Sequence, residues 1–281
     1  MSTAMGFFTD TSVCIGCKAC EVACKEWNHV PEDGLSLTGM SYDNSVGLGA
    51  STWRHVAFIE QPVAPPGPLA TPTGAAQPGP GGAEAMSFRW LMESDVCKHC
   101  TEAGCLDVCP TGALFRTEFN SVVVQNDICN GCGYCVPACP FGVIGRREEP
   151  DHDAAVGLAQ KCTLCYDRLR DDLEPACAKA CPTESIQFGE LAQLRSRARD
   201  RVATLQQAGV AGARLYGADP HDGVGGTGAM FLLLDEPEVY GLPPDPQVPT
   251  RRLGRLWRQA GLAAGTMAAA AAVAFLGGGR S

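Results

Sequence analysis

Residues 129–140 read CNGCGYCVPACP, a run of four cysteines spaced Cys-x2-Cys-x2-Cys-x3-Cys and followed at once by proline. Bacterial ferredoxins hold [4Fe–4S] clusters with runs of this spacing. Three cysteines in a tight loop grip one face of the cubane, and the fourth lies beyond a short spacer. We expect the fourth cysteine to begin a helix, where proline is tolerated because its missing N–H would have no partner anyway.

Working outward from this run, every cysteine of the chain falls into a similar group. The 281 residues contain 16 cysteines, and none is left over. Three of the four groups end in Cys-Pro. The groups are group one (Cys14, Cys17, Cys20, Cys24), group two (Cys97, Cys100, Cys105, Cys109), group three (Cys129, Cys132, Cys135, Cys139) and group four (Cys162, Cys165, Cys177, Cys181).

Disulfides and zinc are the two alternatives to iron–sulfur clusters. The Cys-x2-Cys-x2-Cys run packs thiols too densely for a framework of spaced bridges. A zinc site uses two distant Cys-x2-Cys pairs and has no use for a third nearby cysteine or for a fourth followed by proline. His99 lies inside group two, but this loop already has its cysteines. We therefore interpret His99 as a hydrogen-bond donor near the site or a bystander, and not as a ligand.

In two-cluster ferredoxins the fourth cysteine of a run ligates the other cluster, so the groups work in pairs. Groups two and three lie close together, and Ser121–Gln125 between them predicts a strand. Closeness favours pairing two with three and one with four, although pairing in chain order remains open. The favoured pairing predicts four [4Fe–4S] clusters, held by quartet 1 (Cys14, Cys17, Cys20, Cys181), quartet 2 (Cys24, Cys162, Cys165, Cys177), quartet 3 (Cys97, Cys100, Cys105, Cys139) and quartet 4 (Cys109, Cys129, Cys132, Cys135).

Composition limits the class of protein. The chain holds 33 glycines and 20 prolines, so metal–thiolate bonds must supplement hydrophobic burial. A formal net charge of −9 without a basic stripe argues against nucleic acid as a partner. Met1–Asp10 lacks a signal-peptide pattern, so we expect a cytoplasmic protein or one exported with a partner that carries the signal.

Four further segments have recognisable patterns. Trp53–Glu60 and Phe88–Glu93 predict the two strands of a hairpin. The Pro- and Gly-rich residues 62–82 between them predict a surface insertion. Glu190–Ala208 predicts a helix with an apolar face, four solvated arginines and a stop at the following glycine. Met230–Leu234 predicts a short buried strand.

The C-terminal segment Ala260–Gly279 carries no charge over a length that suits one membrane span. It consists mostly of Ala and Gly, so a membrane anchor and a soluble tail are both open. The arginines at its N-terminal end would keep that side in the cytoplasm. These flanking arginines are Arg251, Arg252, Arg255 and Arg258, and Arg280 follows the segment.

Together these patterns predict an α+β fold, with two ferredoxin-like dicluster units in one chain, short strands and helices around the clusters, and a C-terminal helix. No residue set predicts catalysis by this chain itself. The expected segments are 1–60 (first half of the outer unit), 61–87 (insertion), 88–150 (inner unit with groups two and three), 151–190 (second half of the outer unit), 191–250 (docking extension) and 251–281 (possible membrane anchor).

The chain resembles the iron–sulfur (beta) subunits of respiratory formate dehydrogenase, within the four-cluster subunits of molybdopterin oxidoreductases. The cysteine runs are common to this wider group, whereas the Trp-Asn after group one and the YDN and GVGGT motifs point to the formate branch. The matching motifs are CIGCKACEVACKEWN (Cys14–Asn28), YDN (Tyr42–Asn44), CNGCGYCVPACPFG (Cys129–Gly142), KCTLCYDR (Lys161–Arg168), EPACAKACPT (Glu174–Thr183), GVGGT (Gly223–Thr227) and LPPDP (Leu242–Pro246).

The resemblance implies a non-catalytic subunit in a membrane-associated complex and supports the crossed pairing. A molybdenum or tungsten pterin subunit would oxidise formate, and electrons would enter at groups one and four. They would leave through groups two and three toward a cytochrome b-type subunit and quinone. The alternatives are the same role for an oxidoreductase acting on nitrate, dimethyl sulfoxide or polysulfide, and a stand-alone polyferredoxin. Two departures from the family are the long insertion and the Ala-rich C-terminal segment, which ends without an acidic tail.

Overall fold

The computed structural model describes residues 3–33, 37, 39, 45, 47–63, 87–150 and 152–277. Three parts of the predictions lie outside this range. They are the Tyr42–Asn44 motif, residues 64–86 of the insertion, and residues 278–281 at the C-terminal end.

A four-stranded sheet joins the two ends of the cysteine-containing region. Its order is β8-β1-β10-β9, with β1 antiparallel to β8 and parallel to β10. Because β1 precedes group one and β8 follows group four, their pairing brings these two groups together. The strands are β1 (Met5–Asp10), β8 (Ile186–Glu190), β9 (Arg214–Tyr216) and β10 (Ala229–Leu233).

The sheet separates two cores, because successive strand residues point to opposite faces. Phe7 and Phe231 face the core that holds many of the cysteines, whereas Phe8 and Met230 face helix α6 (Leu191–Gln207). The predicted helix and the buried strand β10 are therefore confirmed. One detail was wrong: of the four arginines expected in solvent, Arg195 and Arg201 are half-buried. Arg201 forms an ion pair with Asp10 at 2.8 Å.

The predicted hairpin is confirmed and is longer than expected. It consists of β2 (Arg54–Val63) and β3 (Ser87–Val96), paired antiparallel with Arg54 opposite Val96. Its base lies against the cysteine-rich body, so residues at the start of β2 are buried there.

The remaining elements are short and surround the cysteine groups. A strand is present where one was predicted between groups two and three. These elements are η1 (Thr11–Val13), α1 (Ala19–Asn28), α2 (Gly104–Asp107), β4 (Leu114–Arg116), β5 (Val122–Val124), α3 (Cys135–Ala138), β6 (Gly145–Arg146), β7 (Ala159–Gln160), α4 (Tyr166–Arg170), α5 (Ala176–Lys179), η2 (Pro237–Tyr240) and η3 (Pro249–Arg252).

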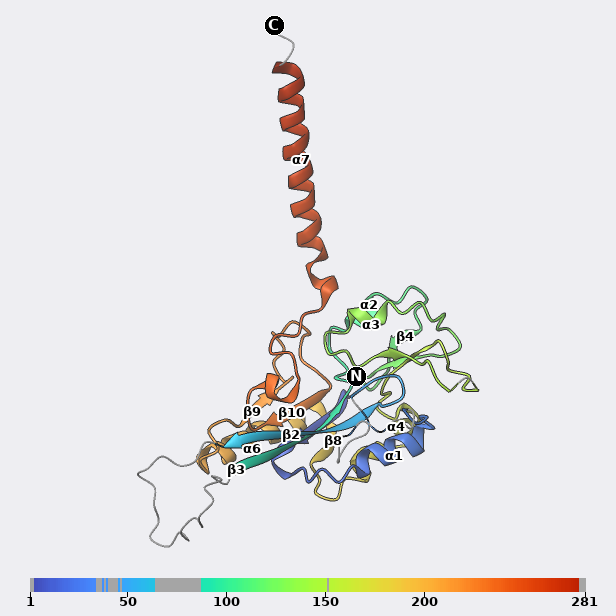
Figure 1. Cartoon of the computed structure of the whole chain (residues 1–281), viewed down its shortest axis with the longest axis vertical. Coiled ribbons are helices and arrows are strands. Elements are labelled where there is room, and N and C mark those ends of the chain that lie inside the picture. Colours follow the sequence, from blue (N-terminus) through green and yellow to red (C-terminus); the bar gives the residue numbers. More distant parts are fainter. Residues whose placement is uncertain are drawn as a thin grey trace.

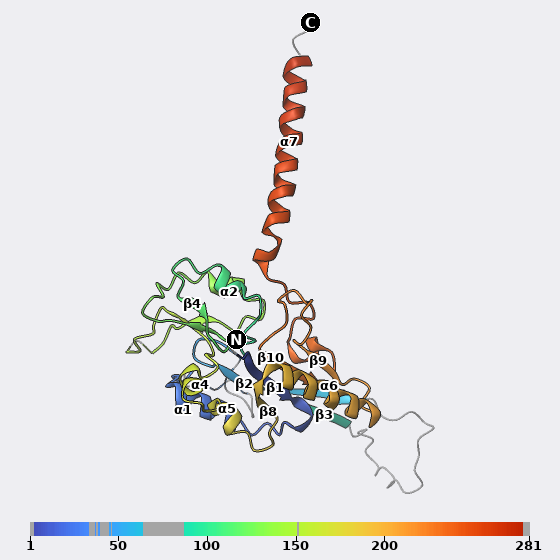
Figure 2. The same ribbon diagram turned by 180° about the vertical axis from the view of Figure 1, so that it is seen from behind.

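Helix α7 (Leu253–Gly277) projects away from the rest of the chain in both views (Figures 1 and 2). It begins before the predicted Ala260 and includes Arg255 and Arg258. Within Pro249–Leu276, an 18-residue window has a mean hydropathy of 1.5, and none of that window is buried. By length and composition, it is apolar enough to cross a membrane.

Candidate metal centres

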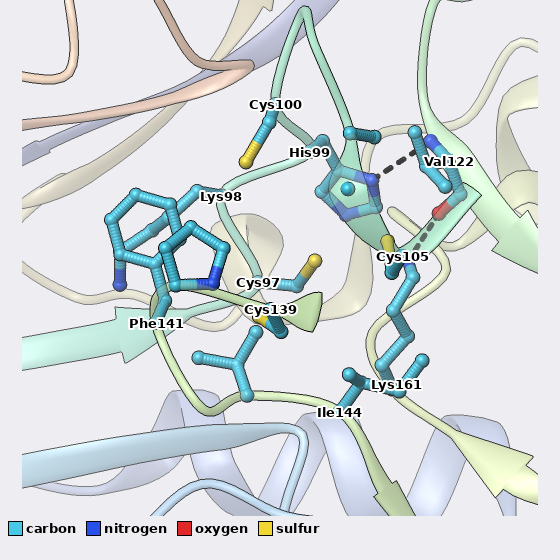
Figure 3. A pocket seen from close by; sticks show the side chains of 14 residues that line it. Cys97, Lys98, His99, Cys100, Cys105, Val122, Cys139, Phe141, Ile144 and Lys161 are labelled. Atoms are coloured by element: carbon cyan, nitrogen blue, oxygen red, sulfur yellow. Dashed lines mark hydrogen bonds between the residues drawn. The ribbon is translucent and has the colours of Figure 1, made fainter. Parts of the chain in front are cut away.

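Quartet 3 surrounds one enclosed cavity. Cys97, Cys100, Cys105 and Cys139 all line it, and Figure 3 shows their side chains around one space. The first three come from group two and the fourth comes from the end of group three. The rest of the wall is mostly apolar and includes Phe141 and Ile144.

Quartet 1 lines a second enclosed cavity in the same manner. Here the first three cysteines of group one meet Cys181, the last cysteine of group four. Val56 and Ser94 of the hairpin close one side, and Ile186 of β8 contributes to another. The antiparallel pairing of β1 with β8 explains how residues so distant in sequence share this cavity.

Quartet 2 is brought together around the side chain of Asn28 at the end of α1. Its amide nitrogen lies 3.8 Å from the sulfur of Cys24 and 3.9 Å from that of Cys165. Burial raises the pKa of the Cys24 thiol well above its ordinary value, and Cys162 and Cys177 add to the rise. Cys24 therefore lies among the first three cysteines of group four.

Quartet 4 gathers beside α3. Burial raises the pKa of the Cys135 thiol to about 11, and the charges of its three quartet partners add to this rise. These partners are Cys129, Cys132 and Cys109. In each pair of groups, the helix carrying cysteines of one group contacts a helix of the other: α1 contacts α5, and α2 contacts α3.

The prediction that a fourth cysteine begins a helix was wrong. Short helices precede Cys109, Cys139 and Cys181, and Cys24 lies inside α1. The prolines that follow Cys109, Cys139 and Cys181 are each the second residue of a turn. The amides of Gly112, Gly142 and Glu184 donate to the carbonyls of these cysteines at 3.4, 3.2 and 3.3 Å. Proline is favoured at this turn position because its ring fixes φ near the required value.

The four quartets form a row in the sense that each has a thiol within electrostatic range of a thiol of the next. Burial raises the pKa of the Cys20 thiol; Arg54 opposes this rise, and Cys177 of quartet 2 adds to it. Burial likewise raises the pKa of Cys162, and Cys97 of quartet 3 contributes. In quartet 3 burial raises the pKa of Cys105 to about 12, with contributions from Cys97, Cys139 and Cys135 of quartet 4. The order along the row is therefore 1, 2, 3, 4.

Exposure to solvent differs between the ends and the middle of this row. Cys17 of quartet 1 and Cys132 of quartet 4 are exposed, whereas all four cysteines of quartet 2 are buried. The two end quartets thus reach the surface.

The quartets fit [4Fe–4S] clusters better than single metal ions. None of the sixteen cysteines forms a disulfide. Within the described part of the chain, no three His, Cys, Asp or Glu side chains converge closely enough for one ion. Zinc requires such convergence, whereas a cubane needs four thiolates spread around a larger body.

Two buried side chains beside the quartets have nitrogen atoms without a hydrogen-bond partner among the described residues. His99 accepts a hydrogen bond from the amide of Val122 through Nδ1 at 3.1 Å, so Nε2 carries the ring hydrogen and has no partner among the described residues. The Nε and Nη2 atoms of Arg54 are likewise unpaired within the described residues. Inorganic sulfide and thiolate are acceptors that such donors can reach. Sequence reasoning missed Arg54, because nothing in its sequence context distinguishes it from an exposed strand residue.

Comparison with known proteins agrees with this geometry. Two family models, both described as 4Fe-4S dicluster domain, match residues 13–113 and 88–191. The chain thus contains two ferredoxin-like 4Fe–4S dicluster domains, with mixed helix and strand content and a C-terminal helix.

Relatives that match most of the chain indicate a more specific family within this class. The formate dehydrogenase iron-sulfur subunit of Haemophilus influenzae is 41% identical over 243 residues, which are 85% of this chain and 68% of the relative. The nitrate-inducible formate dehydrogenase iron-sulfur subunit of Escherichia coli is 38% identical over 86% of this chain and 73% of its own length. The B subunit of the anaerobic dimethyl sulfoxide reductase of Escherichia coli is 31% identical over 72% of this chain and 82% of its own length.

The chain belongs to the family of formate dehydrogenase iron–sulfur subunits. Members of this family are electron-transfer subunits of an enzyme complex and are not catalytic themselves. The predicted resemblance and the non-catalytic role are therefore confirmed.

Proposed function

We propose that this chain conducts electrons through four [4Fe–4S] clusters held by quartets 1 to 4, in that order. The observation that carries the proposal is the row of four thiol quartets with exposed cysteines at both ends and a buried quartet within. The clusters would supply one-electron redox chemistry. The chain itself supplies ligation, spacing and an environment mostly shielded from water, which together set the potentials.

We propose further that electrons enter at quartet 1 from a molybdenum or tungsten pterin subunit that oxidises formate. They leave at quartet 4 toward a cytochrome b-type subunit and quinone. The attachment of α7 supports this direction. Thr250 donates to Asp107 of α2 at 2.6 Å, and Arg251 forms an ion pair with Glu102. If α7 inserts into the membrane, groups two and three lie on the side of the protein that faces it.

The segment boundaries belong to the same proposal. An outer unit formed by 1–60 and 151–190 would enclose an inner unit of 88–150, with 61–87 as an insertion. Residues 191–250 would serve docking, and 251–281 would anchor the complex. The pairing of β1 with β8 and of β4 with β5 supports an outer and an inner unit.

The test is purification of the complex through a tag on this chain, followed by metal analysis and optical spectroscopy. We expect about sixteen iron atoms per chain, four for each cluster. We also expect a pterin-containing partner and bleaching of the visible absorbance when formate is added. A partner that does not respond to formate would contradict the proposal that electrons enter from formate oxidation. About eight iron atoms per chain would contradict the presence of four clusters.

A second candidate is the same role beside another molybdopterin oxidoreductase. The similarity to the B subunit of an anaerobic dimethyl sulfoxide reductase favours it, at 31% identity. The same complex distinguishes the two. Reoxidation of the reduced clusters by dimethyl sulfoxide, with no reduction by formate, would favour the second candidate.

A further inference from the structure

Arg54 is a charged side chain buried where quartets 1 and 2 meet. It begins β2 at the base of the hairpin, and only 1% of the residue is exposed. Among the described residues, neither its Nε nor its Nη2 atom has a nitrogen or oxygen partner, and no carboxylate forms an ion pair with it. Burial raises the pKa of the Cys177 thiol, and the charge and hydrogen bonding of Arg54 oppose this rise. A buried charge left uncompensated is strongly unfavourable. Some nearby negative charge must therefore balance it.

The contacts of Arg54 lead directly to the cysteines. Nη1 donates to the carbonyl and the hydroxyl oxygen of Ser94, at 3.1 and 3.0 Å. The same hydroxyl lies 3.2 Å from the sulfur of Cys20 in quartet 1. The guanidinium also stacks over the ring of Phe7, 4.9 Å from its centroid, and this apolar neighbour keeps water away.

On its other side, Arg54 faces quartet 2. Burial alone would lower the pKa of Arg54, but the charges of Cys177, Cys20 and Cys162 outweigh burial and raise it. Cys177 and Cys162 belong to quartet 2, and Cys20 belongs to quartet 1. One guanidinium therefore lies within electrostatic reach of two thiol quartets.

We propose that the positive charge of Arg54 raises the reduction potentials of the clusters in quartets 1 and 2. This inference rests on the proposed function. Reduction adds one electron to a cluster that is already anionic. A fixed positive charge nearby stabilises the reduced form, and the effect is large because the surroundings exclude water. Arg54 also weakens the repulsion between the two neighbouring clusters.

The experiment is a redox titration of the purified holoprotein followed by electron paramagnetic resonance. Cys14→Ser and Cys165→Ser identify the signals of quartets 1 and 2. We expect Arg54→Met to lower both of these potentials and to leave those of quartets 3 and 4 unchanged, at unchanged iron content. Arg54→Lys keeps the charge and should restore most of the shift. If the Arg54→Met protein loses iron, the titration is repeated with Arg54→Gln, whose amide can still donate a hydrogen bond to Ser94.

Two buried cations provide matched controls. Arg147→Met removes an arginine that is already ion-paired with Asp153 at 2.6 Å, so all four potentials should stay unchanged. Lys161 lies beside Cys97, Cys105 and Cys162, so Lys161→Met should leave quartet 1 unchanged. The inference is overturned if the neutral Arg54 variant, at full iron content, leaves quartets 1 and 2 unshifted or shifts all four equally. Failure of the proposed function is a separate result, because wild-type protein would then lack the four clusters.

Discussion

Cys24 and Cys181 are the residues that would connect the two ends of the proposed outer unit. Each follows three cysteines of its own group, yet its side chain lies among the cysteines of the other group. With this exchange, each proposed cluster of the outer unit would link cysteines that are distant in the sequence. Loss of either cysteine should therefore affect a cluster whose other ligands are remote in sequence.

We predict that Cys24→Ala damages the cluster of quartet 2 and spares that of quartet 1. Cys181→Ala should do the opposite, because this side chain lines the cavity of quartet 1. Each variant should lose up to about four of sixteen iron atoms, as measured by metal analysis. Electron paramagnetic resonance identifies the missing signal. Loss of the quartet 1 signal in Cys24→Ala would contradict the crossed pairing.

Glu93 is a second residue with a measurable consequence. It lies on β3 with 0% exposure, and neither carboxyl oxygen has a hydrogen-bond partner among the described residues. Burial raises the pKa of this carboxyl well above its usual range; Asp95 adds to the rise, and Lys98 opposes it. The folded protein therefore holds a proton here that the unfolded chain releases above about pH 4.3.

The sign of the pH dependence follows from this raised pKa. The contribution of Glu93 to stability is fully present below the unfolded pKa and is lost as the pH rises through the folded one. We predict that Glu93→Gln raises the melting temperature of the holoprotein, and that its advantage over wild type widens between about pH 5 and pH 8. A gain of about 1–2 kcal/mol corresponds to a few degrees. Circular dichroism measures it, with the exposed Glu238→Gln as control. Parallel curves for wild type and Glu93→Gln would contradict the prediction.

At the scale of elements, α7 differs from every other α-helix of the described chain in that none of its described residues is buried. Its attachment to the body instead runs through Thr250 and Arg251 of η3. An exposed apolar helix of 25 residues is unfavourable in water and is long enough for a bilayer. We therefore expect the helix to be dispensable for the fold of the body, and its length and composition suit a membrane.

We predict that deletion of residues 253–281 releases the protein from membranes without loss of its clusters. Full-length and truncated chains are compared by flotation with phospholipid vesicles, and their visible spectra are compared in detergent. We expect only the full-length chain to float and both to give the same iron content. Flotation of the truncated chain, or loss of its iron, would show that α7 is not a separate anchor.

At the scale of the whole molecule, the arrangement of the quartets has an energetic cost without clusters. Burial raises the pKa of most of the quartet thiols, and neighbouring thiolates raise these values further. Cluster binding replaces this mutual repulsion with metal–thiolate bonds. The glycine- and proline-rich chain gains much of its cohesion from them.

We predict that removal of iron by oxidation and chelation unfolds the body. Near-ultraviolet circular dichroism should lose its fine structure, and the elution volume in size exclusion should decrease as the chain expands. Reconstitution with iron and sulfide should reverse both changes. An apoprotein that retains the native spectrum and volume would contradict this dependence.

Much of this structure follows from patterns that act over short distances. The four cysteine groups, the hairpin strands, helix α6 and the buried strand β10 were all predictable. Ligand spacing and side-chain periodicity depend only on neighbouring residues. The prolines after Cys109, Cys139 and Cys181 were assigned to the wrong structure, because proline suits both a helix start and a turn. The hydrogen bonds that define the turns distinguish the two.

The sequence by itself determined the number and grouping of the cysteines and indicated the family to which the chain belongs. The sequence favoured the crossed pairing but left pairing in chain order open, and only the tertiary structure placed Cys24 beside Asn28 and Cys165, and Cys181 in the cavity with Cys14. It also buried Arg54 between two quartets. The sequence around Arg54 does not predict this burial, because it resembles that of an exposed strand residue. The physical reason is that these placements depend on the pairing of β1 with β8 and on helix contacts between distant segments. Local sequence does not encode such long-range packing in a form that can be read directly.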